Sequence, residues 1–124
     1  MLWYVAIGGA AGSVARYLIG TLIQQRVGGT FPLGTLVVNV SGSLLLGVLM
    51  EASLASPALT RDARALLATG LCGGFTTFST FSFESIRLLQ DGDHRRAAAY
   101  IGLSLALSLL AIVAGFGLAR RILA

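Results

Sequence analysis

The sequence predicts an all-α integral membrane protein with four transmembrane helices, the third of which is broken near its middle. Three observations support this fold class. Of the 124 residues, 56% are hydrophobic and only 11% are charged, whereas soluble domains carry about 25% charged residues. Apolar runs recur at the length of about 20 residues that a helix needs to cross a bilayer. The third run is interrupted by glycine, hydroxyl and aromatic residues.

The chain is predicted to form one transmembrane domain, residues 1–124, with room for four spans and little else. The first apolar run lacks the basic start and the short apolar segment of a signal peptide, so it is interpreted as a span. Pro32 precedes the second span, where a missing N–H costs little, and the turn at Gly92 separates the last two. The spans are predicted at about residues 2–23, 33–55, 64–89 and 97–118.

The arginines suggest how the chain sits in a membrane. The net charge of +4 comes from arginines at the ends of apolar runs, which favours contact with lipid headgroups and predicts no nucleic-acid partner. The side with both termini carries Arg61, Arg64, Arg120 and Arg121, and the other side carries Arg26, Arg87, Arg95 and Arg96. Since an arginine bias normally sets orientation, this balance predicts insertion both ways round and an antiparallel, dual-topology homodimer.

Two spans each carry a stripe of polar residues along one helix face. The stripes consist of Thr35, Asn39 and Ser43 in the second span and of Tyr100, Ser104 and Ser108 in the fourth. Polar groups at bilayer depth need a partner or a purpose. Asn39 either bonds to another helix or lines a pore, and the serines either bond back to their own helix or line a water-filled path. Two such stripes on aliphatic surfaces favour a path.

Arg16 lies inside the first predicted span. An arginine at this depth either extends to the headgroups or pairs with a carboxylate, for which Glu84 is one candidate. A cation at the mouth of a pore would also attract anions. On the same span, Gly8 and Gly12 form a GxxxG step that permits close helix packing.

The string "GGFTTFSTFSFE", residues 73–84, interrupts the third span. Gly73 and Gly74 each weaken a helix by about 1 kcal/mol relative to alanine, and the threonines and serines that follow compete for backbone hydrogen bonds. Broken backbone at membrane depth is tolerated only inside protein or along a cavity. It leaves carbonyl oxygens free, and these are ligands for hard cations such as Na⁺.

The same string places Phe75, Phe78 and Phe81 three residues apart. This spacing fits one face of a helical turn. The rings are either core side chains or part of a binding surface, because the positive edge of a phenylalanine ring suits a small anion. The hydroxyl groups between them add O–H donors, which also suit an anion.

Four segments carry a family resemblance: "GTLVVNVSGSLLLG", "GLCGGFTTFSTFSFE", "GGAAGSVARY" and the stripe from Tyr100 to Ser108. They closely resemble the Fluc (CrcB) family of fluoride channels, and the resemblance extends over essentially the whole chain. It implies an antiparallel homodimer of four-span subunits with two pores. It also implies passive export of fluoride across the cell (inner) membrane, which gives fluoride resistance.

The resemblance further implies roles for individual residues. A structural Na⁺ at the dimer centre is implied to bind the backbone carbonyls of Gly73 and Thr76 of each subunit. Arg16 and Glu84 match positions near the vestibules. The residues implied to line the fluoride path are Asn39, Phe78, Ser79, Thr80, Phe81, Tyr100, Ser104 and Ser108.

Two other functions compete with a fluoride channel. A small dual-topology exporter of drugs or other organic cations needs an intramembrane carboxylate, but only Glu51 and Glu84 approach the spans and both lie toward span ends. A membrane scaffold without a transport path is the second rival, and Asn39 with the two polar stripes argues against it. No ATP-binding motif or covalent nucleophile is visible, so an enzyme is not predicted.

Overall fold

The computed structural model describes residues 1–123, which form seven helical segments and no strand. Three of the segments are continuous helices long and apolar enough to cross a membrane, namely α1 (Leu2–Val27), α2 (Leu33–Ala55) and α6 (His94–Leu123). The other four follow one another as α3 (Arg61–Arg64), the π-helix η1 (Ala65–Cys72), α4 (Gly73–Phe75) and α5 (Phe78–Gln90). The predicted all-α fold with membrane-length helices is confirmed.

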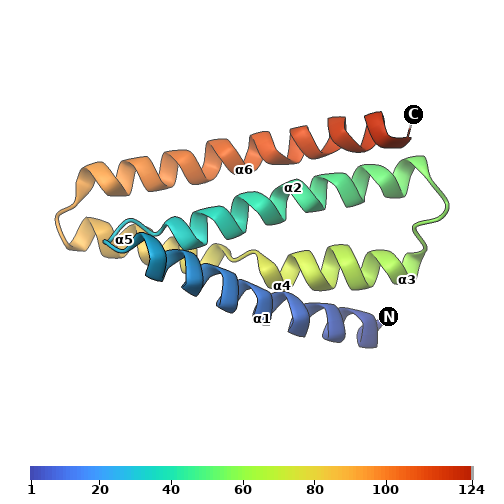
Figure 1. Ribbon diagram of the computed structural model, residues 1–124, viewed down its shortest axis with the longest axis horizontal. Helices are drawn as coiled ribbons and strands as arrows, with labels where there is room; N and C mark the ends of the chain where they lie inside the picture. Colours follow the sequence, from blue (N-terminus) through green and yellow to red (C-terminus); the bar gives the residue numbers. More distant parts are fainter. Residues whose placement is uncertain (124) are drawn as a thin grey trace.

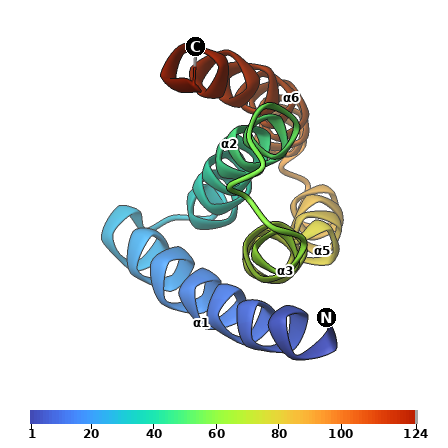
Figure 2. The ribbon, with the colours of Figure 1, turned by 90° about the vertical axis from the view of Figure 1, so that its right-hand side faces the viewer.

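The helices form an elongated bundle in which each stretch of helix runs opposite to the one before it in the chain, so that α2 and α6 run in one direction and α1 and the α3–α5 segments run in the other (Figure 1). Viewed from one end, α2 lies at the centre, with α6 on one side and with α1 and the α3–α5 row on the other (Figure 2). Both termini and the loop at residues 56–60 lie at one end of the bundle (Figure 1). This agrees with the expectation that an even number of rows returns the chain to the side where it began.

α2 and α6 pack against each other along most of their length. Gly47 and Gly115 are buried where they meet, and a Cβ on either would collide with backbone of the opposite helix. At the end of the bundle that holds the termini, the Arg120 guanidinium donates to the Glu51 carboxylate at 2.6 Å. Small residues thus bring these two helices close, and an ion pair joins their ends.

α1 packs against η1 and α4 in a similar way. Gly8 and Gly12 are buried, and Cβ atoms there would meet the backbone carbonyls of Leu66 and Leu71. Gly74 on α4 faces the backbone of α1 with equally little room. The close packing predicted from the GxxxG step is therefore confirmed, and it holds α1 beside the segment that precedes the break.

The third row is broken as predicted, but the glycines are not where it breaks. Gly73 is helical, with φ −62° and ψ −38°, and Gly74 also belongs to α4. The extended residues are Thr76 and Thr77, with ψ values of 153° and 116°. The Thr76 hydroxyl donates to the Cys72 carbonyl at 2.9 Å. The Thr76 N–H also donates to the Cys72 carbonyl, at 3.0 Å, so the helical pattern stops only at Thr77, whose N–H donates to the Asn39 side chain instead.

Two further features of the helices differ from the expectation. The segment that precedes α4, residues 65–72, is a π-helix. π-Helices are rare, and where they occur they are often found at functional sites. The third row also starts at Arg61 rather than at residue 64, because the Thr60 side chain accepts a hydrogen bond from the Ala63 N–H and caps α3. α2 begins and ends at the predicted residues.

Candidate functional site

Two cavities flank the break at Thr76–Thr77. The first cavity has a volume of about 380 Å³ and lies between α1, α2 and α5. The second cavity has a volume of about 280 Å³ and lies between α2, α6 and the residues on both sides of the break. Thr77 lines both cavities. The break therefore stands where two concave spaces meet in a bundle of membrane-length helices, the first with mixed polar and apolar walls and the second with mostly apolar walls that include a few polar groups.

The first cavity is lined largely by polar side chains. Its lining consists of Arg16, Tyr17, Gly20, Thr21, Gln24, Thr35, Val38, Thr77, Thr80 and Glu84. The Nε of Arg16 donates to the Gly74 carbonyl at 3.1 Å and so ties α1 to α4. The candidate ion pair between Arg16 and Glu84 is not found among the described residues. The Glu84 carboxylate instead accepts a hydrogen bond from the Tyr100 hydroxyl at 3.0 Å.

The second cavity brings together parts of both polar stripes and the aromatic rings. Its lining consists of Asn39, Ser43, Leu46, Thr76, Thr77, Phe78, Phe81, Ser104, Leu105, Ser108 and Leu109. Ser104 is only 6% exposed, and its hydroxyl has no hydrogen-bond partner among the described residues. The Ser104 hydroxyl does not donate to a carbonyl of its own helix, so the interpretation that the serines of this stripe bond back to their helix is wrong for Ser104. A buried hydroxyl without a partner is a donor available to a ligand.

Asn39 on α2 binds the backbone of the break from both sides. Its side-chain Nδ2 donates to the Thr77 carbonyl at 3.1 Å, and its Oδ1 accepts from the Thr77 N–H at 2.8 Å. The interhelical hydrogen bonding considered for Asn39 is therefore present. Because the amide has two N–H donors, and because Asn39 lines the second cavity, this bonding leaves one N–H for a ligand.

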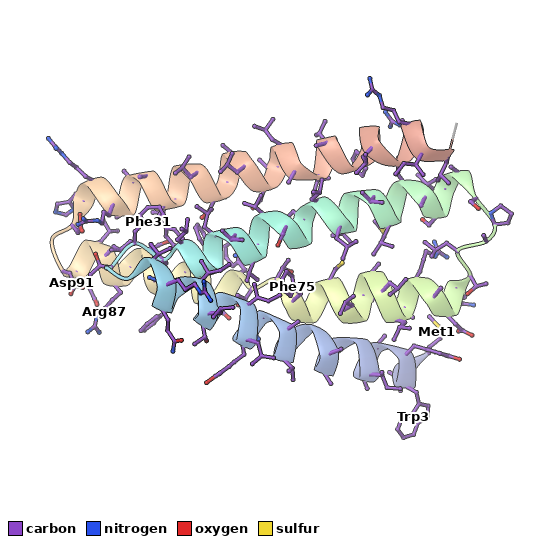
Figure 3. The ribbon with its side chains drawn as sticks, in the orientation of Figure 1. Met1, Trp3, Phe31, Phe75, Arg87 and Asp91 are labelled. Atoms are coloured by element: carbon purple, nitrogen blue, oxygen red, sulfur yellow. The ribbon has the colours of Figure 1, made fainter. Side chains whose placement is uncertain are left out.

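Four aromatic rings form a continuous row from the α1–α2 turn to the break. The Phe31 and Tyr100 ring centroids are 5.8 Å apart, those of Tyr100 and Phe81 are 5.4 Å apart, and those of Phe81 and Phe78 are 5.6 Å apart. Phe31 lies at one end of the bundle and Phe75 near its middle (Figure 3). Phe75 ends α4, before the break, whereas Phe78 begins α5. The expectation that three phenylalanines share one helical face is therefore wrong, because the break separates the first from the others.

The carbonyls predicted to bind a cation lie on either side of Phe75. Neither the Gly73 nor the Thr76 carbonyl accepts a hydrogen bond from the described residues. Gly73 is exposed, and no atom lies within 4 Å of the position that a Cβ would occupy. Residues 1–123 hold no group of three or more His, Cys, Asp or Glu placed to bind a metal ion. The oxygen donors that the break offers a cation are thus backbone carbonyls.

Comparison with known proteins identifies the family. The family model described as "CrcB-like protein, Camphor Resistance (CrcB)" matches residues 3–116. The chain belongs to this family. CrcB-like relatives named "Fluoride-specific ion channel FluC" match nearly its whole length. The protein from Syntrophotalea carbinolica is 48% identical, with 98% of each chain covered. That from Rhizobium meliloti is 48% identical over 94% of this chain and 93% of the relative, and that from Clostridium perfringens is 44% identical over 94% and 91%.

Other predicted residues of the CrcB-like chain lie around these cavities. Thr80 lines the first cavity. Tyr100 is fully buried and connects the two cavities indirectly, through Glu84 on one side and Phe81 on the other. Ser79 is exposed and lines neither cavity, but its hydroxyl lies 3.3 Å from that of Thr77.

Gln24 and Phe31 were not predicted from the sequence of this CrcB-like chain, and Thr77 was expected only as one of the hydroxyl donors of the string. The Gln24 amide donates to the Phe31 carbonyl at 3.0 Å and accepts from the Gly34 N–H at 3.1 Å, so it joins the end of α1 to the start of α2. Gln24 and Phe31 flank a turn, where no periodic pattern marks them. Thr77 belongs to the quoted string, and its position after a helix-ending residue and before an apolar ring is a signal of an N-cap.

Proposed function

We propose that this CrcB-like protein is a fluoride-selective ion channel through which fluoride leaves the cytoplasm passively, giving fluoride resistance. The relatives named as fluoride channels over nearly the whole chain support this function. They carry the name of a channel rather than of an enzyme, in agreement with the prediction that the chain is no enzyme. The observation that carries the proposal is the meeting of two cavities at a broken helix, with hydroxyl and amide donors in their walls.

The donors around the break suit a small anion. Fluoride holds water strongly, so a pore must replace that water with hydrogen-bond donors. The second cavity offers the unpartnered Ser104 hydroxyl, the Ser108 hydroxyl and the remaining N–H of Asn39. Phe78 and Phe81 line the same cavity, and the positive edges of their rings add to this stabilisation. A negative-inside membrane potential favours exit of an anion by about 2.3 kcal/mol per 100 mV.

The first cavity has the properties of a vestibule. Arg16 places a positive charge in its wall, and Glu84 is held away from that charge by the Tyr100 hydroxyl. A cationic group in a concave site raises the local concentration of anions. The shared cavity supports the proposal that Arg16 and Glu84 lie near a pore mouth, although no ion pair joins them among the described residues.

The assembly that we propose is an antiparallel, dual-topology homodimer of four-span subunits in the cell (inner) membrane, with the α3–α5 row as the third span. Equal numbers of arginines at the two ends of the bundle support insertion in both orientations. Phe78, which lines the second cavity, is 75% exposed in one protomer. A second protomer would cover this ring and complete the wall of the cavity.

Na⁺ at the centre of such a dimer fits the backbone of the break. The Gly73 and Thr76 carbonyls accept no hydrogen bond from the described residues, and Gly73 lies at the surface. Carbonyl oxygens from both protomers would hold the ion. When bound, Na⁺ would supply positive charge that stabilises these carbonyls and joins the two protomers.

A dual-topology exporter of organic cations is the alternative function, and the position of Glu84 in a cavity is the observation that favours it. Such an exporter exchanges protons for cations at an intramembrane carboxylate. Arg16 lines the same cavity and would repel a cationic substrate. Glu84 also accepts a hydrogen bond from the Tyr100 hydroxyl, so this carboxylate is already engaged within the protein. The structure therefore supports the anion channel better.

The two functions are separated by transport measurements on purified protein in liposomes. Fluoride-loaded vesicles with a potassium ionophore should release fluoride to an external electrode, whereas chloride-loaded vesicles should release little chloride. A parallel assay should detect no uptake of an organic cation driven by a proton gradient. Equal fluoride and chloride release, or release no faster than from protein-free vesicles, would refute the channel.

A further inference from the structure

Thr77 has a position that no other described residue shares, because it lines both the first and the second cavity. It is an extended residue between α4 and α5. Its backbone is fixed, since both its N–H and its carbonyl bind the Asn39 side chain. An ion that moves from one cavity to the other passes this residue.

The Thr77 hydroxyl already takes part in several hydrogen bonds. It accepts from the Thr80 N–H at 3.2 Å, which caps α5. It also donates to the Thr80 hydroxyl at 3.1 Å and lies 3.3 Å from the Ser79 hydroxyl. A hydroxyl group has one proton, which rotates to suit its surroundings. The backbone at Thr77 is therefore held in place while the direction of its O–H donor can change.

Donors on both sides of Thr77 lack a committed acceptor. When the Thr80 hydroxyl accepts from Thr77, its own proton is free to point into the first cavity. In the second cavity, the buried Ser104 hydroxyl has no partner among the described residues. A small anion without its hydration water needs a hydrogen-bond donor at each step, so on leaving one donor it must reach the next. Thr77 lies between these two donors, and its hydroxyl is the group that can close the gap.

We propose that the Thr77 hydroxyl is the hydrogen-bond donor that an anion meets at the junction of the two cavities, and that it determines selectivity there. The proton turns from the Thr80 oxygen to the passing anion and then returns. The cap on α5 persists during this movement, because the same oxygen goes on accepting from the Thr80 N–H. This inference rests on the proposed conduction of fluoride.

The test compares three variants with the wild-type protein in the fluoride and chloride release assay. Thr77→Val keeps the shape of the side chain but removes its donor, and should reduce fluoride release about tenfold and lower the ratio of fluoride to chloride, since the loss concerns a hydrogen bond to a charged group. Thr77→Ser keeps the hydroxyl and should stay within about threefold of wild type. Thr60→Val removes the N-cap of α3, far from either cavity, and should leave both rates unchanged.

The outcomes distinguish this inference from the proposed function. Normal fluoride release and selectivity in Thr77→Val, or equal damage in Thr77→Ser, would overturn the role of the hydroxyl while leaving the channel intact. Absence of fluoride release from the wild-type protein would overturn both proposals. Should Thr77→Val fail to assemble on size exclusion, Thr77→Asp retains an N-cap but offers no donor, and wild-type release from that variant would overturn the inference.

Discussion

α6 and the α3–α5 row both run along the bundle and are built in opposite ways. α6 is one helix of 30 residues. The α3–α5 row comprises helices of 4, 8, 3 and 13 residues and two extended threonines. In α6, the backbone hydrogen bonds are satisfied within the helix, and a side chain such as Ser104 remains without a partner. In the α3–α5 row, the backbone around the break has polar groups that are bonded by side chains of neighbouring helices, at Gly74 and Thr77.

The difference shows how a helix that is interrupted in its middle is held in place by its neighbours. Arg16 from α1 donates to the Gly74 carbonyl, and Asn39 from α2 binds both polar groups of the Thr77 backbone. Unsatisfied backbone groups are costly where water is absent. The α3–α5 row should therefore depend on side chains of other helices, whereas α6 should tolerate the loss of its partners.

The largest expected effect comes from Asn39→Leu, which tests this dependence directly. The substitution keeps a similar volume but leaves the Thr77 N–H and carbonyl unpaired, at a cost of about 1–3 kcal/mol for each buried group. We expect a lower temperature of unfolding in detergent and loss of fluoride release from liposomes. Ser53→Ala is the control, since this exposed serine on α2 bonds only to its own helix. Wild-type stability in Asn39→Leu would show that the break does not depend on α2.

A smaller effect is expected from replacing the rings beside the break. Phe78→Ile or Phe81→Ile removes a positive ring edge from the second cavity while keeping an apolar side chain, so fluoride release should fall by about tenfold or less. The proposed dimer should elute on size exclusion at the same position as that of the wild-type protein. Phe83→Ile is a matched control, because Phe83 is 66% exposed on the same helix and lines neither cavity. If Phe78→Ile and Phe81→Ile release fluoride as fast as the control Phe83→Ile, the rings of Phe78 and Phe81 contribute packing and do not interact with the anion.

The contrast between these rows also explains what the sequence could predict. The break was predictable because a run of hydroxyl residues interrupts an apolar span. Its position was not, since Gly74 stays helical where it contacts the backbone of α1. The partners of Arg16 and Glu84 were also unpredictable, because they come from residues 58 and 16 positions away. The spacing of polar residues predicts which face of α2 and of α6 is polar, but it does not predict which side chains of different helices form hydrogen bonds.

Glu51→Gln on α2 tests the tolerance expected of α6, because it changes a partner of Arg120. The variant weakens the ion pair between Glu51 and Arg120, which joins the ends of α2 and α6. Because the Arg120 side chain is 67% exposed, the loss should be no more than about 1 kcal/mol. Fluoride release should be unchanged, and the temperature of unfolding should shift far less than in Asn39→Leu. A loss of stability comparable to that of Asn39→Leu would remove the contrast between the two rows.

The smallest effect is expected where α6 begins, at Asp93. Its carboxylate accepts from the Arg96 side chain at 2.8 Å and from the Arg96 N–H at 3.3 Å. The hydrogen bond from the Arg96 side chain is the main cause that lowers the pKa of Asp93 below its ordinary value of 3.8. Because the pKa is lower in the folded state, the stabilisation is present above pH 3.8 and is lost as the pH falls through the folded value.

Asp93→Asn checks this pH dependence, because its side-chain oxygen still caps α6 but does not titrate. Temperatures of unfolding in detergent should favour the wild-type protein slightly at pH about 6, and the difference should shrink as the pH is lowered below 3.8 and the carboxylate takes up a proton. A difference that persists at the lower pH would show that Asp93 acts through its shape and not through its charge. In either case α6 should remain one continuous helix, since the interior of the helix needs no partner from elsewhere.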